Sequence, residues 1–234
     1  MDGVKLELAA EAVHSRWADP TPGTTLASVG FGTASNLPQL VGRVKFEGKA
    51  GDLSWMAYLA GSYESVNLKG FGSINPNGIT LLDGSVKTSI SPYVGEVGGL
   101  FKFNPVSLAL NVYTGKGTGP MAGSLLQMGD IGDTGYWVQL GVNATSEFSI
   151  WGLYGADAIN KTDLAKWVPA TAAGAPKSDN QLFGGQLRYQ EGGYAFAAEY
   201  YRYSTKYLAV AGANNYPQTT TNAMQLLLTG AYFF

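Results

Sequence analysis

The chain has 234 residues, enough for one sizeable domain, and its formal net charge of −2 gives no basic surface for nucleic acid. Cysteine is absent, which excludes disulfides, thiolate chemistry and cysteine metal sites. Charged residues make up only 14% of the chain, against roughly 25% in soluble domains. No apolar run approaches the roughly 18 residues that a membrane helix needs, which excludes a helical membrane protein.

The first two predicted strands cover residues 4–13 and 39–49, with a Gly- and Pro-rich loop between them. In both segments apolar and charged side chains alternate, and the two-residue period of a strand places them on opposite faces. The charged positions that share a face are Lys5, Glu7, Glu11, Arg43, Lys45 and Glu47.

The middle of the chain repeats one rhythm, in which a short turn joins two strands and a long loop separates each pair from the next. The predicted strands here are 53–63, 86–103, 106–113, 136–144 and 148–156. Short turns lie at 51–52, 104–105 and 145–146, and a long loop occupies 114–134. Glu96 and Lys102 fall on the polar face of the strand that ends at residue 103.

The last three predicted strands are 182–190, 194–203 and 222–234, and the first of them follows a long loop at 157–180. A turn at 191–193 joins the first two, which carry Arg188 and Glu199 on their polar face. In the final strand Met224, Leu226, Leu228 and Tyr232 share one face.

This pattern predicts one all-β domain over 1–234, a transmembrane antiparallel up-and-down β-barrel of about ten strands. An even strand number, short turns on one side and long loops on the other are typical of such barrels. A soluble β-sandwich is the alternative, because alternating strands at roughly 8–12-residue spacing also describe one. A sandwich has no reason to alternate turn length.

The C-terminal residues 231–234 carry Tyr232 and Phe234 on one face, and this ending resembles the barrel-closing signature of bacterial outer-membrane proteins. Segments 103–117 and 137–164 look like the C-terminal half of the larger, roughly sixteen-stranded porins of Gram-negative bacteria. The resemblance implies an outer-membrane location, a bilayer around the barrel and recognition of the last strand by the barrel-insertion machinery. A monomer or a homotrimer fits it equally. A natural ten-stranded barrel, an engineered one and a shortened larger porin all stay open.

The predicted function is a porin-like channel for passive diffusion of small hydrophilic solutes or ions. If the polar face points inward, the predicted pore-lining residues are Arg43, Lys45, Glu47, Glu96, Lys102, Arg188 and Glu199. In a wide pore such charges line water and set ion selectivity. In a narrow one they pair across the interior, and the alternative function is a non-conducting structural or anchor barrel with a charge-filled lumen.

Two further groups of residues invite functional interpretations. The apolar patch within 114–134 is a possible constriction loop and consists of Met121, Leu125, Leu126 and Met128. Seven aromatic residues suit either sugar stacking or, as we expect, packing and the aromatic girdles at the two membrane interfaces. These are Tyr58, Tyr63, Trp137, Trp151, Tyr200, Tyr201 and Tyr203.

The sequence lacks the residues that the usual enzyme sites require. The only histidine, His14, is expected to be an ordinary residue at the barrel rim, and the sequence around Lys116 lacks the spacing of a phosphate-binding loop. Asp130 and Asp133 in a glycine-rich segment are interpreted as solvated loop acids rather than cation ligands. We therefore predict no enzyme activity, no cofactor and no metal. We interpret Met1 as the start of a mature or shortened chain, because residues 1–8 lack the pattern of a secretory signal.

Overall fold

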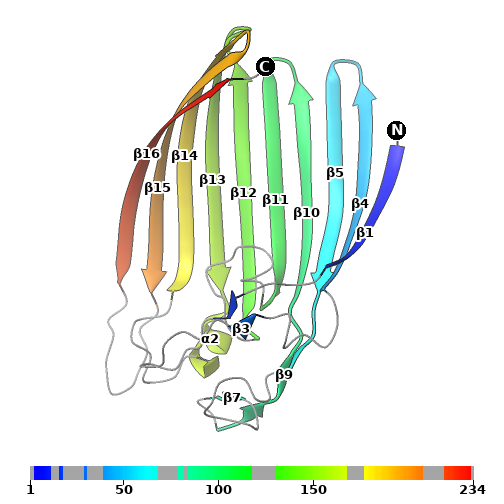
Figure 1. The fold of residues 1–234 in the computed structure, drawn as a ribbon, viewed down its shortest axis with the longest axis vertical. Helices are drawn as coiled ribbons and strands as arrows, with labels where there is room; N and C mark the ends of the chain where they lie inside the picture. Colours follow the sequence, from blue (N-terminus) through cyan, green and yellow to red (C-terminus); the bar gives the residue numbers. More distant parts are fainter. Residues whose placement is uncertain are drawn as a thin grey trace.

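Ten long antiparallel strands form a single curved sheet in the computed structural model (Figure 1). The structure describes residues 3–11, 16–17, 29–30, 39–67, 79–81, 84–117, 130–167, 177–207 and 219–232. In sheet order the strands are β1 (Gly3–Glu11), β4 (Gln39–Ala50), β5 (Leu53–Tyr63), β10 (Tyr93–Phe103), β11 (Val106–Lys116), β12 (Gly132–Asn143), β13 (Phe148–Ile159), β14 (Lys177–Glu191), β15 (Tyr194–Tyr207) and β16 (Thr220–Tyr232). The predicted all-β, up-and-down architecture is confirmed.

The turns of the sheet lie at one end of the strands and the long connections at the other (Figure 1). The four predicted short turns join β4 to β5, β10 to β11, β12 to β13 and β14 to β15, and both chain ends lie on their side. In the β12–β13 turn, hydroxyl groups of Ser146 and Thr145 donate to Glu147 and lower the pKa of its carboxyl. Glu147 therefore keeps its charge to a lower pH than an ordinary glutamate does.

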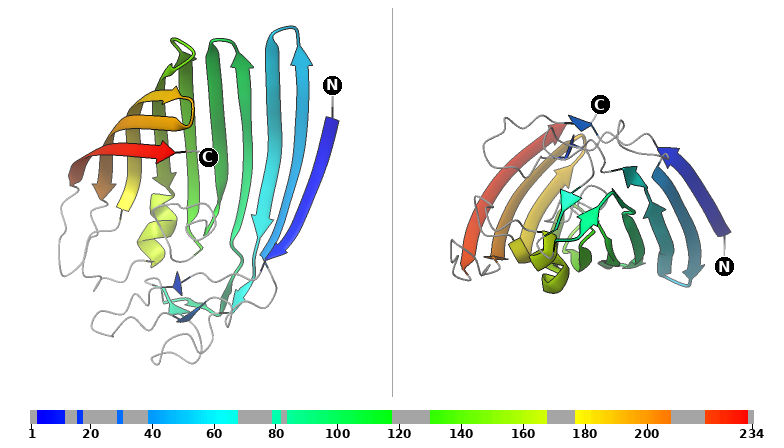
Figure 2. Two further views of the ribbon diagram at one scale, coloured as in Figure 1. Left: turned by 45° about the horizontal axis from the view of Figure 1, so that its top comes forward. Right: turned by 90° about the horizontal axis from the view of Figure 1, so that it is seen from below.

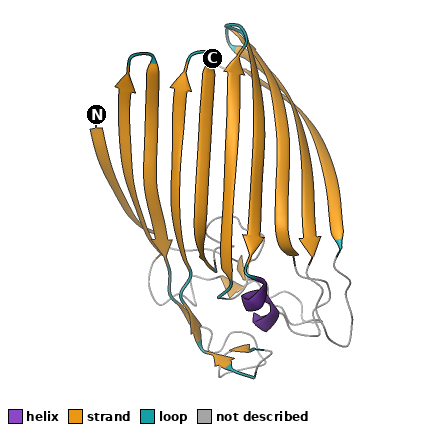
Figure 3. Cartoon of the chain, turned by 180° about the vertical axis from the view of Figure 1, so that it is seen from behind, coloured by secondary structure: helices purple, strands orange, loops and turns teal. Residues whose placement is uncertain are grey.

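The long connections hold more structure than the sequence predicts. A short helix, α2 (Lys161–Trp167), lies at the loop end of the sheet (Figure 3), in a segment predicted as plain loop. Three pairs of two-residue strands also occur, formed by β2 (Arg16–Trp17) with β3 (Val29–Gly30), β6 (Val66–Asn67) with β9 (Ser89–Ile90), and β7 (Ile79–Thr80) with β8 (Val86–Lys87). Lys116, expected in a flexible loop, is the last residue of β11.

The sheet curves into a trough whose two edges are β1 and β16 (Figure 2). Each of these edge strands has one neighbour within the described residues, so the ten strands do not close into a barrel on their own. No second large sheet covers either face in the described parts of the chain, because the three additional sheets have two strands each. The sandwich alternative is therefore not supported.

Cross-strand register gives the trough one apolar face. Directly opposed residues point to the same side of a sheet, and the register runs from Leu6 through Val44, Leu59 and Val97 to Val112 without a break. On β16 the same face carries Met224, Leu226 and Leu228, which are 73%, 70% and 79% exposed. An apolar surface of this extent needs an apolar surrounding.

Buried hydrophobic side chains are few in the described residues, and most of them lie beyond the membrane-length part of the strands. Ile131, Ile159 and Leu164 are almost fully buried where α2 meets β12 and β13. The Asn160 side chain caps the helix by accepting from the backbone N–H groups of Thr162 and Asp163. A small core thus anchors the loop end, while the sheet itself has exposed faces.

Glycine and aromatic residues pair across neighbouring strands on the less apolar face. A Cβ placed on Gly98, Gly135, Gly141 or Gly184 would come closer than 3.0 Å to an aromatic ring of the next strand. The four rings belong to Tyr58, Tyr113, Trp151 and Tyr201, each directly opposite its glycine. The missing side chain of glycine gives each ring room to lie on the strand backbone.

We expect Gly98→Ala to lower the free energy of unfolding by about 1–3 kcal/mol, because its new methyl group displaces the Tyr58 ring. Gly95, on the same strand, has nothing within 4 Å of the same position and provides the matched control. Gly95→Ala should leave stability unchanged or raise it by a few tenths of a kcal/mol. Urea unfolding in lipid vesicles measures both, and equal effects would refute the packing role of Tyr58.

Candidate functional site

The predicted charged residues lie together on one face of the trough. Lys5 is opposite Lys45, Glu7 is opposite Arg43, and Lys102 and Glu96 follow on β10 with the same parity. Register carries this parity through β11 to β15, where it reaches Arg188 and Glu199. All seven predicted pore-lining residues therefore share a face, and Glu11 has the same parity in the β1 register.

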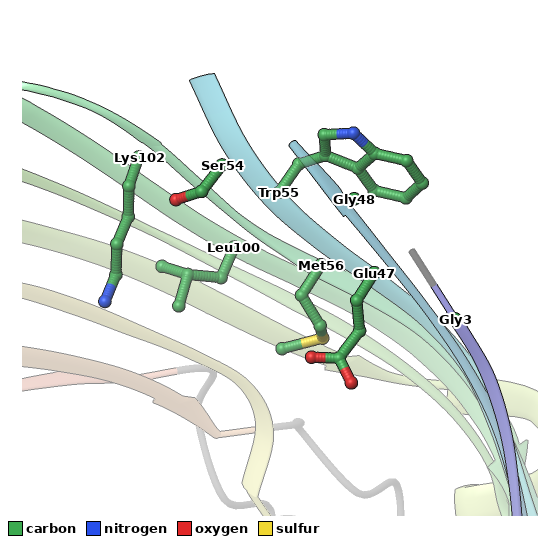
Figure 4. Close-up of a pocket in the computed structure, with 8 residues that line it drawn as sticks. All are labelled: Gly3, Glu47, Gly48, Ser54, Trp55, Met56, Leu100 and Lys102. Atoms are coloured by element: carbon green, nitrogen blue, oxygen red, sulfur yellow. The ribbon is translucent and has the colours of Figure 1, made fainter. Parts of the chain in front are cut away.

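This charged face is the concave one. Figure 4 shows Glu47, Met56, Leu100 and Lys102 pointing to the inside of the curved sheet and Trp55 pointing to the outside. The inward side chains line most of a hollow of about 460 Å³ near the turn end of β4, β5 and β10. Polar inside and apolar outside is the arrangement of a barrel that holds water within and lipid around it.

Two ion pairs form between predicted residues. Arg43 of β4 contacts Glu7 of β1, with side chains 45% and 42% exposed, and Lys45 lies 2.8 Å from Glu47 on the same strand. Exposed pairs of this kind contribute about 0–1 kcal/mol each and hold their side chains against the wall. Both pairs join residues of one wall, as neighbours, and do not bridge the interior.

A second cluster centres on Asn111 of β11, a residue to which the sequence pattern gave no role. Asn111 is 4% exposed, and its amide donates to the Tyr58 hydroxyl at 2.7 Å and to Glu96 at 3.1 Å. These contacts span β5, β10 and β11. A hydrogen bond to a carboxylate is charge-assisted and therefore strong. The bond from Asn111 thus holds the Glu96 side chain against the wall in a fixed position.

Glu199 occupies a similar setting on β15. Gln186 of β14 donates to its Oε1 at 2.6 Å, and the Tyr201 hydroxyl donates to its Oε2 at 2.7 Å. On β14 the Arg188 guanidinium donates to Gln190. Glu96 and Glu199 are thus fixed by neutral groups, whereas Glu7 and Glu47 are paired with cations. Sequence alternation identifies these carboxylates, but their partners depend on cross-strand register.

The loop end of the trough is tied together by contacts among the long connections. Lys87 of β8 lies 3.6 Å from Asp130, which links two connections far apart in sequence. The Asp163 carboxylate of α2 accepts from the backbone N–H of Gly132 at 3.1 Å. Asp133, expected in a loop, belongs to β12 and is 6% exposed. These contacts hold helix α2 and the segments around Lys87 and Asp130 close to the wall at the loop end of the sheet.

Several predicted features lie outside the described residues. They are the possible constriction loop of Met121, Leu125, Leu126 and Met128, the single histidine His14, and the terminal Phe234. Tyr232, the other residue of the barrel-closing signature, ends β16 on the apolar face, with its ring 4.8 Å from that of Tyr194.

Five of the seven aromatic residues lie on the charged face. Register places Tyr58, Trp137, Trp151, Tyr201 and Tyr203 there, and Tyr63 and Tyr200 on the apolar face. A girdle at the membrane interface must face lipid, so the girdle interpretation is wrong for these five. Packing over glycine accounts for Tyr58, Trp151 and Tyr201.

The described residues also bear on two other features, a metal site and a membrane-spanning helix. No group of three His, Asp or Glu side chains there has the arrangement to hold a metal ion. None of the described helices is long and apolar enough to cross a membrane.

An antiparallel up-and-down sheet with a charged concave face and an apolar convex face defines the class of outer-membrane β-barrel folds. One solved structure agrees with this class. The chain superposes on the outer membrane channel DcaP of Acinetobacter baumannii with a TM-score of 0.63 and 15% sequence identity, over 98% of this chain and 59% of that one. At this identity the likeness shows the fold.

A second match is OmpT, an outer membrane protein of Vibrio cholerae, with a TM-score of 0.48 and 15% identity over 84% of this chain and 56% of that one. No protein-family model and no curated protein matches the chain. The chain spans 59% of the DcaP chain, so the described sheet corresponds to part of that barrel.

Proposed function

We propose that the protein forms part or all of the wall of a channel in a bacterial outer membrane, through which small hydrophilic solutes or ions diffuse passively. The observation that carries the proposal is the separation of the two faces. The seven predicted pore-lining residues share the parity of the concave face, and the convex face is mainly apolar from Leu6 to Leu228, with Arg202 and Lys206 of β15 toward its loop end. The channel fold of DcaP supports the same function.

A closed wall is necessary for a channel, because each unpaired strand edge in lipid leaves polar backbone groups without partners. The free edges of β1 and β16 therefore need to pair with each other or with further strands. The chain spans 59% of the DcaP chain, and pairing of the two edges with further strands would give a wider barrel with an aqueous interior.

The alternative function is a non-conducting barrel that serves as a membrane anchor with a charge-filled interior. The pairs Arg43–Glu7 and Lys45–Glu47 favour it, since paired charges are what a filled interior requires. Their side chains are up to 45% exposed, however, and each pair lies along one wall. Wall-bound pairs leave the interior open, which favours the channel.

Single-channel conductance distinguishes the two functions. The purified chain, refolded in detergent and shown by circular dichroism to be rich in strand, is inserted into a planar lipid bilayer. A channel predicts stepwise ohmic openings, and an anchor predicts a folded protein that inserts and stays silent. Counting subunits by crosslinking in the same detergent decides between a monomer and a homotrimer.

A further inference from the structure

The concave face carries a band of aromatic side chains that the channel function does not require. Tyr58, Tyr113, Trp137, Trp151 and Tyr201 come from β5, β11, β12, β13 and β15, and all share the parity of the charged residues. We call these five residues the aromatic band. Because they face away from the apolar surface, anchoring at the membrane interface does not explain them.

Four rings of the band lie over glycine, which orients them. Tyr58, Tyr113, Trp151 and Tyr201 occupy the space that a Cβ of the opposite glycine would fill. A ring in that position lies against the strand backbone on the concave side of the sheet. Trp137 covers no glycine with its ring and is 37% exposed. It is therefore the most accessible platform of the band.

Hydrogen-bonding groups lie directly beside these rings. Glu96 lies beside Tyr58, joined to it through the buried Asn111, and Glu199 with Gln186 adjoins Tyr201. Gln139 is the next residue after Trp137 on the same face of β12. Flat apolar surfaces bordered by amides and carboxylates are complementary to a molecule with apolar faces and a hydroxyl rim. Sugar rings have this chemistry.

The dimensions of the band favour a chain of sugars over a single one. Tyr58 on β5 and Trp137 on β12 are three strand intervals apart in the sheet order, which corresponds to about 14 Å across the sheet. Toward β15, Tyr201 and Trp151 lie two and four residues nearer the turn end than the level of Trp137, which is about 7 and 13 Å along the strands. We propose that the aromatic band is a binding track for neutral oligosaccharides. This proposal rests on the proposed function in one respect, namely that the pore gives the sugar access to the band.

Isothermal titration calorimetry of the refolded protein in detergent with maltotriose as the probe tests the track without requiring conduction. Saturable binding is expected, and polyethylene glycol of the same mass should give none, since it lacks sugar-ring faces. Trp137→Ala should weaken maltotriose binding about five- to tenfold, because it removes one stacking platform. Tyr136→Ala, the adjacent residue on the apolar face with 45% exposure, should leave binding unchanged.

Absence of saturable binding to the folded protein would overturn the proposal, and so would equal losses in the Trp137 and Tyr136 variants. Conductance separates this outcome from failure of the channel function. Openings without sugar binding would reject the track and keep the channel, whereas sugar binding by a silent protein would keep the track and reject the channel.

Discussion

Leu228→Lys on β16 should destabilise the folded protein by about 2–4 kcal/mol in lipid vesicles, as expected for a lysine placed in the apolar part of a bilayer. Leu228 is 79% exposed on the apolar face, so the new ammonium group has only lipid around it. Leu227 is its neighbour on the same strand and points to the concave face, where it is 38% exposed. It gives a control with the same chemical change and nearly the same depth.

Leu227→Lys should cost less than about 1 kcal/mol, because its ammonium group stays in water and joins a face that already carries charges of both signs. Urea unfolding followed by tryptophan fluorescence gives both free energies. If Leu227→Lys destabilised the protein as much as Leu228→Lys, or more, the assignment of the two faces would be wrong.

The double substitution Lys102→Glu with Arg188→Glu should raise the ratio of cation to anion permeability about tenfold. Both residues lie on the concave face near the turn end, and together the changes remove four units of positive charge. At about 8 Å in water each unit alters the free energy of a passing ion by about 0.5 kcal/mol. Salt screening at about one Debye length leaves about a third of this effect, so a cation gains and an anion loses about 0.7 kcal/mol. The two opposite shifts add to about 1.4 kcal/mol in the ratio.

Reversal potentials in a tenfold KCl gradient measure this ratio. The neutral double variant Lys102→Gln with Arg188→Gln should give about half of the shift in free energy, which excludes an indirect structural effect. Lys206→Glu, near the loop end on the other face of β15, should shift the ratio much less. Unchanged selectivity in the Glu double variant, together with normal conductance, would show that these residues do not line the ion path.

Most of the sheet follows from local patterns in the sequence. Alternation places the ten strands, and the Gly-Asp turn after Ala50 or the Asn-Pro turn after Phe103 ends them sharply. The face on which each side chain lies follows from the same alternation, because successive residues of a strand point to opposite sides of the sheet. For this reason Arg43, Lys102 and Arg188 share a face as predicted.

Features that depend on contacts between distant segments do not follow from those patterns. Helix α2 has seven residues, and the burial of Leu164 and the bond between Asp163 and Gly132 hold it in place rather than its own propensity. The role of Asn111 depends on having Tyr58 and Glu96 on neighbouring strands. The girdle interpretation was wrong for Trp137, because aromatic residues also lie on the inner face. The number of aromatic residues alone does not determine which face each one occupies.

The central claim is that the charged face lines water and the opposite face meets lipid. The absence of native cysteine makes this directly measurable, since any introduced thiol is the only one in the protein. Lys102→Cys and Phe101→Cys put that thiol on adjacent residues with opposite parity on β10. A charged, membrane-impermeant thiol reagent added to single channels should lower the conductance of the Lys102→Cys protein and leave the Phe101→Cys protein unaffected. Modification of Phe101→Cys instead, or a conducting Lys102→Cys protein that does not react, would contradict the claim.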